Sequence, residues 1–372
     1  MLSHHMTDMA MNGRRRFCND NEMTEEKRAG YMRRALELAR LGMDYASPNP
    51  MVGAVIMSPD GRIIGEGWHR RCGEGHAEVN AVASVSEADR ALLAESTMFV
   101  TLEPCSHYGK TPPCAELIIR TGIPRVVVAT QDPFAKVCGR GIAMLREAGV
   151  EVEVGLLGEE SRELNRRFFT AHMLKRPLIT LKWARSADGF MDWHRCDGHE
   201  NPCRFSTPLT SLLTMRLRSL HDAVLTTSAT VNADNSRLTV RGWDGKQPLR
   251  IVLDLSGRLK PDAAILNDGG IPPLVIGRDM LPSQRGALPQ LFSKLYAEYG
   301  LTSVLVEAGP TFLEALIEAG LWDDAREEIA PVVLGSQGRH PAPVLPAFMI
   351  SATEDCGSNR IVWYRNQSMG KG

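Results

Sequence analysis

One histidine, one glutamate and two cysteines in this chain have the types and the order that metal-assisted hydrolysis needs. His76 and Glu78 are separated by one residue, and Cys105 and Cys114 follow downstream. An imidazole and two thiolates can bind Zn²⁺ and leave its fourth position open for water, as catalytic zinc sites do. A nearby carboxylate that is not a ligand can carry protons to and from that water. The sequence therefore predicts a catalytic zinc site with Glu78 as its acid and base.

These residues are similar to the H-x-E…P-C-x-x-C signature of zinc-dependent base deaminases. Pro104 precedes Cys105 as in the signature, but eight residues separate the two cysteines instead of two. His76 and Cys114 are both expected near helix starts, because helical hydrophobic spacing follows each of them. Helix starts favour anions, so we expect this setting, together with the metal, to hold both cysteines as thiolates.

Two other interpretations of these metal-binding residues stay open. A fourth protein ligand would close the site and make it structural, although a closed site has no use for Glu78. The candidates for that ligand are His107, Cys72 and Cys138. The second interpretation is a disulfide between Cys105 and Cys114. The eight cysteines are unevenly spaced and the chain has no secretory hydrophobic segment, which favours free thiols in a reducing cytoplasm.

The length and composition of the chain are those of a soluble protein with two domains. Its 372 residues are 43% hydrophobic and 23% charged, and the formal net charge is −1. No apolar run approaches the ~20 residues that cross a bilayer. The near-neutral charge gives no reason to expect a nucleic-acid partner. We therefore expect a cytoplasmic protein that binds neither membrane nor nucleic acid.

Strands and helices are expected to alternate from residue 24 onward. Residues 1–23 lack hydrophobic periodicity and are predicted to be a disordered extension, with Met23 as an alternative start, and Thr24 is expected to cap the first helix. The predicted strands are 52–57, 62–67, 97–101, 126–130 and 150–154, then 178–183, 223–227, 250–255, 274–276 and 304–306. Helices are predicted near 142–148 and over 312–319. This alternation predicts a layered α/β domain in each half, with a boundary near Leu174–Pro177.

Longer motifs closely resemble the bifunctional deaminase–reductase family of bacterial riboflavin biosynthesis. In the first half they are Pro48–Gly53, Thr101–Cys114 with its long loop between the cysteines, Gln131–Pro133 and Gly139–Gly141. The resemblance covers nearly the whole chain from residue 24. It implies a cytidine-deaminase-like α/β/α domain over residues 24–172, followed by a dihydrofolate-reductase-like α/β domain over residues 176–368.

The resemblance implies that the first domain removes an amino group from a small molecule, a diaminopyrimidine ribosyl phosphate. His76, Cys105 and Cys114 match the family's zinc ligands, and Glu78 matches its catalytic residue. The residues that match its substrate contacts are Asn49, His69, His107 and Lys110. Taken without the resemblance, Asn49 between two prolines is equally suited to a turn, and Lys110 to a solvated loop.

For the second domain the resemblance implies NADPH-dependent reduction of the ribosyl group to a ribityl chain. The matching segments are Leu181–Gly189, Thr226–Asp234, Leu238–Arg241 and Val306–Thr311. The substrate contacts implied are Lys182, Arg218, Leu238, Arg241 and Glu307, and the cofactor contacts are Ala184, Thr230, Asp234 and Gly309. Gly309 lies between a strand and a helix, where backbone amides can bind a phosphate, although a tight turn needs glycine there in any case.

Some positions depart from the family pattern. Arg185 stands where a small or neutral residue is usual, Asn235-Ser236 replaces a more usual pair, and the segment from His194 to Asp197 matches no pattern. The roles of Pro202, Arg204 and Ser206 are therefore not assigned. One alternative is a deaminase whose second domain only binds nucleotides or supports oligomers. Two others are a nucleoside or RNA deaminase and a zinc-stabilised binding protein. Family analogy implies a homo-oligomer.

Overall fold

The computed structural model describes residues 24–108, 112–133, 138–195, 201–281 and 287–366, and the chain forms two compact units. The first unit contains the chain up to Gly42 together with Met51–Leu164. The second contains the segment Met43–Pro50 and the chain from Asn165 onward. These units differ from the predicted domains because helix α6 (Arg166–Leu174) and the segment Met43–Pro50 group with the second unit. The predicted extension 1–23 lies outside the described residues.

The first unit is built on a five-stranded mixed sheet in the order β2-β1-β3-β4-β5. Its strands are β1 (Gly53–Met57), β2 (Ile63–Trp68), β3 (Thr97–Val100), β4 (Arg125–Val128) and β5 (Glu151–Val154). Strand β1 pairs antiparallel with β2 and β3, whereas β3, β4 and β5 are parallel. All five predicted strands are confirmed, with ends displaced by at most two residues.

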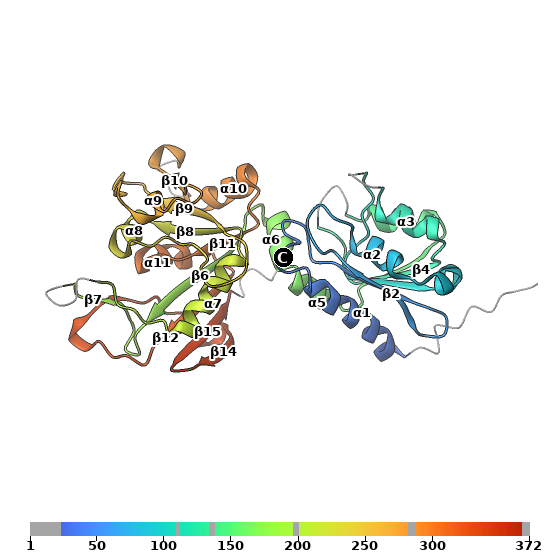
Figure 1. The fold of residues 1–372 in the computed structure, drawn as a ribbon, viewed down its shortest axis with the longest axis horizontal. Coiled ribbons are helices and arrows are strands. Elements are labelled where there is room, and N and C mark those ends of the chain that lie inside the picture. Colours follow the sequence, from blue (N-terminus) through green and yellow to red (C-terminus); the bar gives the residue numbers. More distant parts are fainter. Residues whose placement is uncertain (1–23, 109–111, 134–137, 196–200, 282–286, 367–372) are drawn as a thin grey trace, which may run out of the picture. The chain divides into compact units, whose positions relative to one another are not determined.

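Helices cover both faces of this sheet (Figure 1). One face packs against α1 (Glu25–Arg40), which Thr24 caps as predicted; α5 (Gly158–Leu164) lies beside α1. The other face packs against α2 (Ala77–Ser84), α3 (Cys114–Thr121) and α4 (Arg140–Glu147), and a 3₁₀ segment, η2 (Glu87–Glu95), follows α2. Val55 and Phe99 contribute to the α1 layer, and their neighbours Ile56 and Met98 to the other, as strand alternation requires. The α/β/α layers predicted for the first half are confirmed.

The second unit contains an eight-stranded sheet in the order β10-β9-β8-β11-β6-β12-β15-β14. The strands are β6 (Leu178–Arg185), β8 (Ala223–Thr227), β9 (Leu249–Leu253), β10 (Leu274–Ile276), β11 (Ser303–Val306), β12 (Asp324–Ile329), β14 (Ile350–Cys356) and β15 (Asn359–Arg365). The six from β10 to β12 are parallel, and β15 and β14 are antiparallel additions at one edge. A separate two-stranded sheet pairs β7 (Phe190–Trp193) with β13 (Gly338–Pro341).

The large sheet also has a hydrophobic layer on each face. On one face α10 (Ala287–Tyr299) and α11 (Pro310–Glu318) pack against Leu181 and Leu225. On the other, α7 (Pro208–Ser219), α8 (Ser228–Asp234) and α9 (Ala264–Asn267) pack against Val224 and Leu305. Three short 3₁₀ segments are η3 (Arg278–Met280), η4 (Gly335–Gln337) and η5 (Ala347–Met349).

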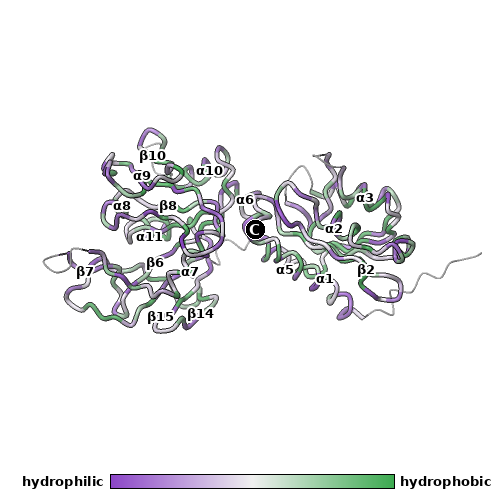
Figure 2. Tube along the Cα trace, in the orientation of Figure 1, coloured by the Kyte–Doolittle hydropathy of each residue, from purple (hydrophilic) through white to green (hydrophobic). Residues whose placement is uncertain are grey.

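Hydrophobic stretches coincide with most of the parallel strands (Figure 2). The five strands and the helix predicted for the second half are confirmed there. In the described parts of the chain, no helix combines the length and the apolar character needed to span a membrane.

Candidate active sites

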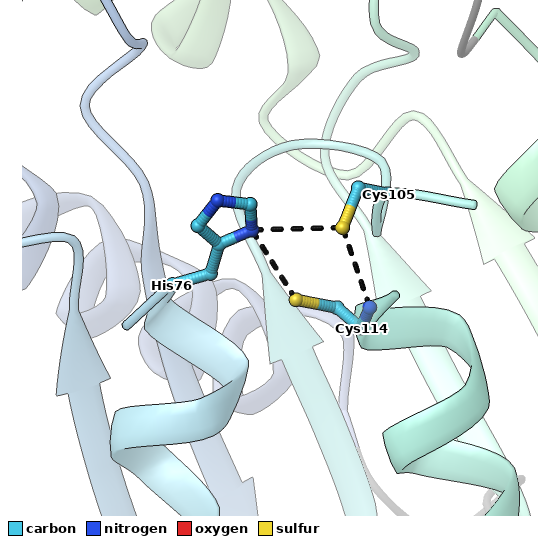
Figure 3. A group of neighbouring side chains, drawn as sticks. All are labelled: His76, Cys105 and Cys114. Carbon is cyan, nitrogen blue, oxygen red and sulfur yellow. Dashed lines mark hydrogen bonds between the residues drawn. The ribbon is translucent and has the colours of Figure 1, made fainter. Parts of the chain in front are cut away.

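The three proposed zinc ligands lie together in the first unit, and one of them, Cys105, lies in the loop that follows β3 (Figure 3). His76 is the N-cap residue of α2, and Cys114 is the first residue of α3. The Nδ1 atom of His76 lies 3.6 Å from Sγ of Cys105 and 3.4 Å from Sγ of Cys114. The backbone N–H of Cys114 donates to Sγ of Cys105 at 3.3 Å. One nitrogen and two sulfur donors at this spacing fit tetrahedral zinc, whose ligands lie ~2.0–2.3 Å from the metal.

The electrostatics of the cluster favour a metal cation. Hydrogen bonding from Cys114 lowers the pKa of the Cys105 thiol to about 4, whereas the same contact raises the pKa of Cys114. The hydrogen bond to Cys105 raises the pKa of His76 to about 9. Cys105 is thus a thiolate at neutral pH, the form that binds metal ions and attracts positive charge.

Glu78 is the second residue of α2 and lies in its first turn, two positions after the N-cap residue His76. Its side chain is 3% exposed, and burial raises the pKa of its carboxyl to about 7 although the His76 charge opposes that shift. A buried carboxyl beside a metal-binding cluster can both accept and donate a proton.

The alternatives for the metal-binding residues can be examined in the structure. The six described cysteines are free thiols, so the disulfide between Cys105 and Cys114 is wrong. Among the described residues, no fourth side chain joins the cluster of three. Cys72, Cys138 and His107, the candidates for a closing ligand, are exposed.

Buried polar groups hold the segments that carry the ligands. The Asn80 amide donates to the carbonyl oxygens of Trp68 and Gly75 at 2.8 and 3.1 Å, which fixes the turn before His76. Glu103, two residues before Cys105, is 4% exposed. Its carboxylate accepts four backbone N–H groups at 2.9–3.4 Å, those of Asp132, Gly139, Gly141 and Ile142. The sequence does not single out Glu103 as a functional residue, because its partners are backbone groups that no residue pattern reveals.

The four predicted substrate contacts of the first site have different positions. His69 is 2% exposed, its ring lies 5.4 Å from that of His76, and burial lowers its pKa. His107 is exposed, in the loop between the two cysteines. Asn49 lies in the segment Met43–Pro50 that groups with the second unit, where its N–H donates to Ala46 O. Lys110 lies outside the described residues.

The second unit brings Arg218 of α7 and Glu307, directly after β11, into a bidentate ion pair of 2.6 and 2.9 Å. Burial alone raises the pKa of Glu307, but the Arg218 guanidinium outweighs it and lowers the value to about 2. The third nitrogen of Arg218 donates to the Thr239 carbonyl at 3.0 Å, and Arg241 donates to the Thr239 hydroxyl at 2.8 Å. Leu238 is buried with a φ of +56° at the start of this segment. Arg218, Glu307 and Arg241 thus belong to one connected group.

Lys182 adds a further cation next to this ion pair. It lies on β6, and burial lowers the pKa of its ammonium while the Glu307 carboxylate opposes that shift. Its cross-strand partner is Arg326 on β12, a 2% exposed arginine that sequence analysis missed. Arg326 lies 3.9 Å from Glu328 and 3.4 Å from the Thr214 hydroxyl. Two neighbouring cations therefore share the sheet face that α7 covers.

Two of the residues that depart from the family pattern, Arg185 and Asn235, have structural explanations, whereas Cys196 and Asp197 lie outside the described residues. Arg185 donates to Glu327 at 2.6 Å, on the face of β6 that also carries Trp183. Because successive strand residues face opposite sides, its side chain lies on the face opposite Lys182. Asn235 caps α8 with a φ of +47° and accepts the Ala264 N–H at 2.7 Å. Nothing in the structure explains Ser236.

A cavity of about 810 Å³ opens at the carboxyl ends of β8, β9 and β11. Thr230, Asp234 and Gly309, three of the four predicted cofactor contacts, line it. The N–H of Gly309, the N-cap of α11, donates to the Thr230 hydroxyl at 3.1 Å, so the starts of α8 and α11 are joined. The volume lies within the ~300–1,000 Å³ of small-molecule and cofactor sites. The residues present fit a dinucleotide.

The remaining contacts are less closely grouped. Ala184, the fourth predicted cofactor contact, is half-buried on β6 and is not among the residues that line the cavity. Pro202 lines the cavity, Arg204 is exposed, and the Ser206 hydroxyl donates to Glu328 at 2.9 Å.

Both halves of the chain match known protein families. Residues 25–130 match the cytidine and deoxycytidylate deaminase zinc-binding region, and residues 177–347 match the RibD C-terminal domain. The chain is 39% identical over 324 residues to the riboflavin biosynthesis protein RibD of Bacillus amyloliquefaciens, which covers 82% of this chain and 85% of that protein. It is 37% identical over 336 residues to RibD of Escherichia coli, which covers 83% and 89%.

Two solved structures are similar over nearly the whole chain. Acinetobacter baumannii RibD superimposes with a TM-score of 0.80 at 32% identity, over 92% of this chain and 99% of that one. A Thermotoga maritima diaminohydroxyphosphoribosylaminopyrimidine deaminase/5-amino-6-(5-phosphoribosylamino)uracil reductase gives 0.79 at 32% identity, with the same coverage.

Proposed function

Because this chain belongs to the RibD family of riboflavin biosynthesis proteins, we propose that its first unit carries the deaminase and its second unit the reductase of that pathway. The protein is a bifunctional enzyme that uses Zn²⁺ and NADPH. It removes an amino group from 2,5-diamino-6-(5-phosphoribosylamino)pyrimidin-4-one and then reduces the ribosyl side chain of the product to ribityl. One observation carries the assignment of the deaminase residues. His76, Cys105 and Cys114 form a cluster, and the buried carboxyl of Glu78 lies in the first turn of α2, the helix that His76 caps.

In the first unit His76 Nδ1 and the two cysteine sulfurs would hold the zinc ion. A bound zinc ion lowers the pKa of a water ligand toward neutrality and so supplies a nucleophile. The protein's own contribution is proton transfer: Glu78 takes up a proton during attack on the ring carbon and passes it to the departing amino group. His69, packed edge-on against His76, is the residue that we expect to contact the pyrimidine.

In the second unit NADPH supplies the hydride, and the side chains orient the sugar. Arg218 acts through Glu307, because its guanidinium is already bonded to that carboxylate and to Thr239. Lys182, for which no hydrogen bond or ion pair with another described residue is found, is then available to bind a sugar oxygen. Arg241 has an exposed side chain and suits the 5′-phosphate.

Replacement of Glu78 by Gln tests the assignment of the first unit. The change keeps the shape of the side chain but removes its ability to accept a proton. We expect ammonia release to fall by roughly 10²–10⁴-fold, with the zinc content unchanged by metal analysis. Glu74→Gln, a change at an exposed carboxylate in the turn before His76, is the matched control and should keep full activity. Unchanged turnover by Glu78→Gln would contradict the proposal.

The alternative of a deaminase with a merely nucleotide-binding second unit is not favoured, since residues 177–347 match the RibD C-terminal domain. The protein acts on a small molecule. We also propose that it forms a homo-oligomer and works in the cytoplasm. The six described cysteines are free thiols, which suits a reducing compartment. Light scattering on the purified protein would contradict the oligomer if it gave the mass of one chain at micromolar concentration.

A further inference from the structure

A buried arginine to which the proposed reaction gives no role lies beside the reductase residues. Arg326 is 2% exposed, and an arginine is rarely so deeply buried unless its charge is paired. It lies on β12 and is directly paired in register with Lys182 of β6. Neighbouring strands are ~4.8 Å apart, so residues paired in this way have adjacent side chains on one face of the sheet. Two cations therefore lie side by side on the face that α7 covers.

The partners of Arg326 match its charge only partly. Its Nη1 donates to the Thr214 hydroxyl at 3.4 Å and lies 3.9 Å from the Glu328 carboxylate. Its other terminal nitrogen, Nη2, has no hydrogen-bond partner among the described residues. The Glu328 carboxylate is itself occupied, because it accepts from Asn359 at 2.6 Å and from Ser206 at 2.9 Å. Arg326 thus lacks the bidentate carboxylate that would fully match a buried guanidinium.

The charged groups around Lys182 leave one positive charge in excess. Among the described residues they come from three elements: Glu307 after β11, Arg218 of α7, and Arg326 and Glu328 of β12. Burial acts to raise the pKa of each carboxyl, but hydrogen bonds and neighbouring cations outweigh it and lower the pKa of Glu307 to about 2 and that of Glu328 below its ordinary value. Three cations therefore face two carboxylates. Because Arg218 binds both oxygens of Glu307, the excess charge lies with Lys182 and Arg326.

A second cation beside Lys182 changes what its ammonium can do. Burial is the main cause that lowers the pKa of Lys182, the Glu307 carboxylate opposes that shift, and the charge of Arg326 adds to it. An ammonium next to a like charge gives up its proton more readily. The electrostatic repulsion also acts against contacts of Lys182 with β12.

Reduction of the ribosyl group needs such a proton donor. When the sugar ring opens, the C1′–O4′ bond breaks, the nitrogen lone pair forms a C1′=N bond, and O4′ takes up a proton from the ammonium. C1′ then accepts the hydride of NADPH, and solvent returns a proton to the amine of Lys182. Proton transfer from a positioned side chain typically contributes ~10²–10⁴-fold to such a step.

We propose that Arg326 is a positioning residue of the reductase site, whose like charge directs the Lys182 ammonium away from β12 and toward the ring oxygen of the sugar. The inference rests on the proposed reductase function, because Lys182 is a proposed substrate contact. Arg326 acts through Lys182 and has no contact with the substrate in this proposal.

The pH dependence of NADPH oxidation by the deaminated substrate tests the inference in the full-length protein. In the wild type, oxidation should decrease as the pH rises through the pKa of Lys182, because the neutral amine cannot donate the proton. Arg326→Met removes the like charge, so the decrease should move to higher pH by roughly 1–3 units, the range for one neighbouring charge. Arg326→Gln, which can still bond to Thr214, is a second neutral variant and should shift the profile in the same direction. Arg326→Lys keeps the charge and should restore the wild-type profile.

Glu328→Gln supplies a test of the opposite sign. It removes a negative charge that faces Lys182, so the decrease in oxidation should move to lower pH. Disturbed packing lowers the rate of either variant, but it does not shift the two profiles in opposite directions. Arg360→Leu is the matched control, since Arg360 is an exposed arginine of β15 that pairs with Asp355 at 3.1 Å. It should keep the wild-type profile.

The titration of Lys182 itself separates this inference from the proposed function. The pH dependence of its acetylation by acetic anhydride, followed by mass spectrometry of the peptide that contains it, reports its pKa without turnover. We expect a higher pKa in Arg326→Met and Arg326→Gln and a lower one in Glu328→Gln. An unchanged pKa in the two neutral Arg326 variants, or a shift of the same sign in Glu328→Gln, would overturn the inference. If these shifts occur but the wild type does not oxidise NADPH, the charge coupling stands and the proposed reductase function is wrong.

Discussion

At the scale of single residues, the first site depends on a carboxylate that does not touch the proposed metal ligands. The Glu103 carboxylate accepts hydrogen bonds from four backbone N–H groups, which lie after β4 and at the start of α4. Because Glu103 is two residues before Cys105, the same contacts fix the chain that carries this ligand. A β carbon on Gly141 would lie 1.9 Å from the carbonyl oxygen of Pro104. The start of α4 is therefore in close contact with the segment that precedes Cys105.

Glu103→Gln should therefore impair the deaminase and spare the reductase. The substitution replaces one carboxylate oxygen of Glu103 with an amide NH₂, which faces backbone N–H groups and cannot accept hydrogen bonds from them. Each buried donor left without an acceptor lowers the free energy of unfolding by roughly 1–3 kcal/mol. We expect a lower zinc affinity and slower ammonia release, with unchanged reduction of the deaminated substrate. Glu147→Gln, at an exposed glutamate of α4, should behave as the wild type. If both activities of Glu103→Gln fall together, the residue serves general folding and not this site.

Residue types and order were sufficient to predict His76, Cys105 and Cys114, since only a few combinations of ligands suit zinc. They were not sufficient for Arg326, whose proximity to Lys182 follows from the pairing of β12 with β6. The paired residues are 144 positions apart in the sequence, so their contact depends on the folded sheet and cannot be predicted from local residue spacing.

At the scale of elements, α2 positions His76 by lying directly on β2. A β carbon on Gly67 would lie 2.2 Å from the Ala81 nitrogen and 2.5 Å from the Ala77 carbonyl oxygen. These are backbone atoms of α2 and cannot rotate away, so only a residue without a side chain permits the contact.

Gly67→Ala should displace α2 and weaken the first unit. We expect a loss of roughly 1–3 kcal/mol in the free energy of unfolding, as for other overpacked positions. Zinc affinity should fall with it, because His76 caps the displaced helix. Denaturant titration with metal analysis measures both. Gly30→Ala in α1, where a β carbon meets no atom within 4 Å, is the control and should be neutral or stabilising. A Gly67→Ala protein as stable as Gly30→Ala would refute this explanation.

Most strands could be predicted because they are continuous hydrophobic runs buried on both faces. Strand β12 could not, since its sequence DAREEI has three consecutive charged residues that suggest an exposed segment. In the structure those charges are paired inside the sheet: Glu327 accepts from Trp183, Arg185 and Tyr364, and Glu328 accepts from Asn359. The partners come from two other strands, β6 and β15, so their presence could not be inferred locally.

His221, just after α7, makes the stability of the second unit dependent on pH. Its Nδ1–H donates to the Leu217 carbonyl, and its Nε2 lies 2.9 Å from the Thr180 hydroxyl, from which the neutral ring accepts a hydrogen bond. Burial lowers its pKa to about 4. Between this value and the ~6.5 of an unfolded histidine, only the unfolded chain binds the proton. The free energy of unfolding should therefore decrease as the pH falls through that window, by up to ~1.4 kcal/mol per unit.

Denaturant titrations at pH 7, 6 and 5 check this expectation. His221→Gln should show a flatter pH dependence than the wild type, whatever its stability at pH 7. An identical slope in the two proteins would mean that His221 is not the group responsible.

At the scale of the whole molecule, each unit has its own sheet and its own hydrophobic core. The proposed zinc ligands all come from the first unit, and the proposed cofactor cavity lies in the second. Removal of zinc by a chelator should therefore stop ammonia release but leave the oxidation of NADPH by the deaminated substrate unchanged. Added zinc should restore the first activity. Loss of both activities on chelation would show that the reductase also depends on the metal.

The most direct test of the two-activity assignment is to supply 2,5-diamino-6-(5-phosphoribosylamino)pyrimidin-4-one to the zinc-loaded protein, first without NADPH and then with it. Ammonia release and absorbance at the nicotinamide band are followed together. We predict ammonia release in the absence of NADPH, and then oxidation of one NADPH for each ammonia released. Zinc-loaded protein that releases no ammonia would contradict the account, and ammonia release without any oxidation of NADPH would contradict its second half.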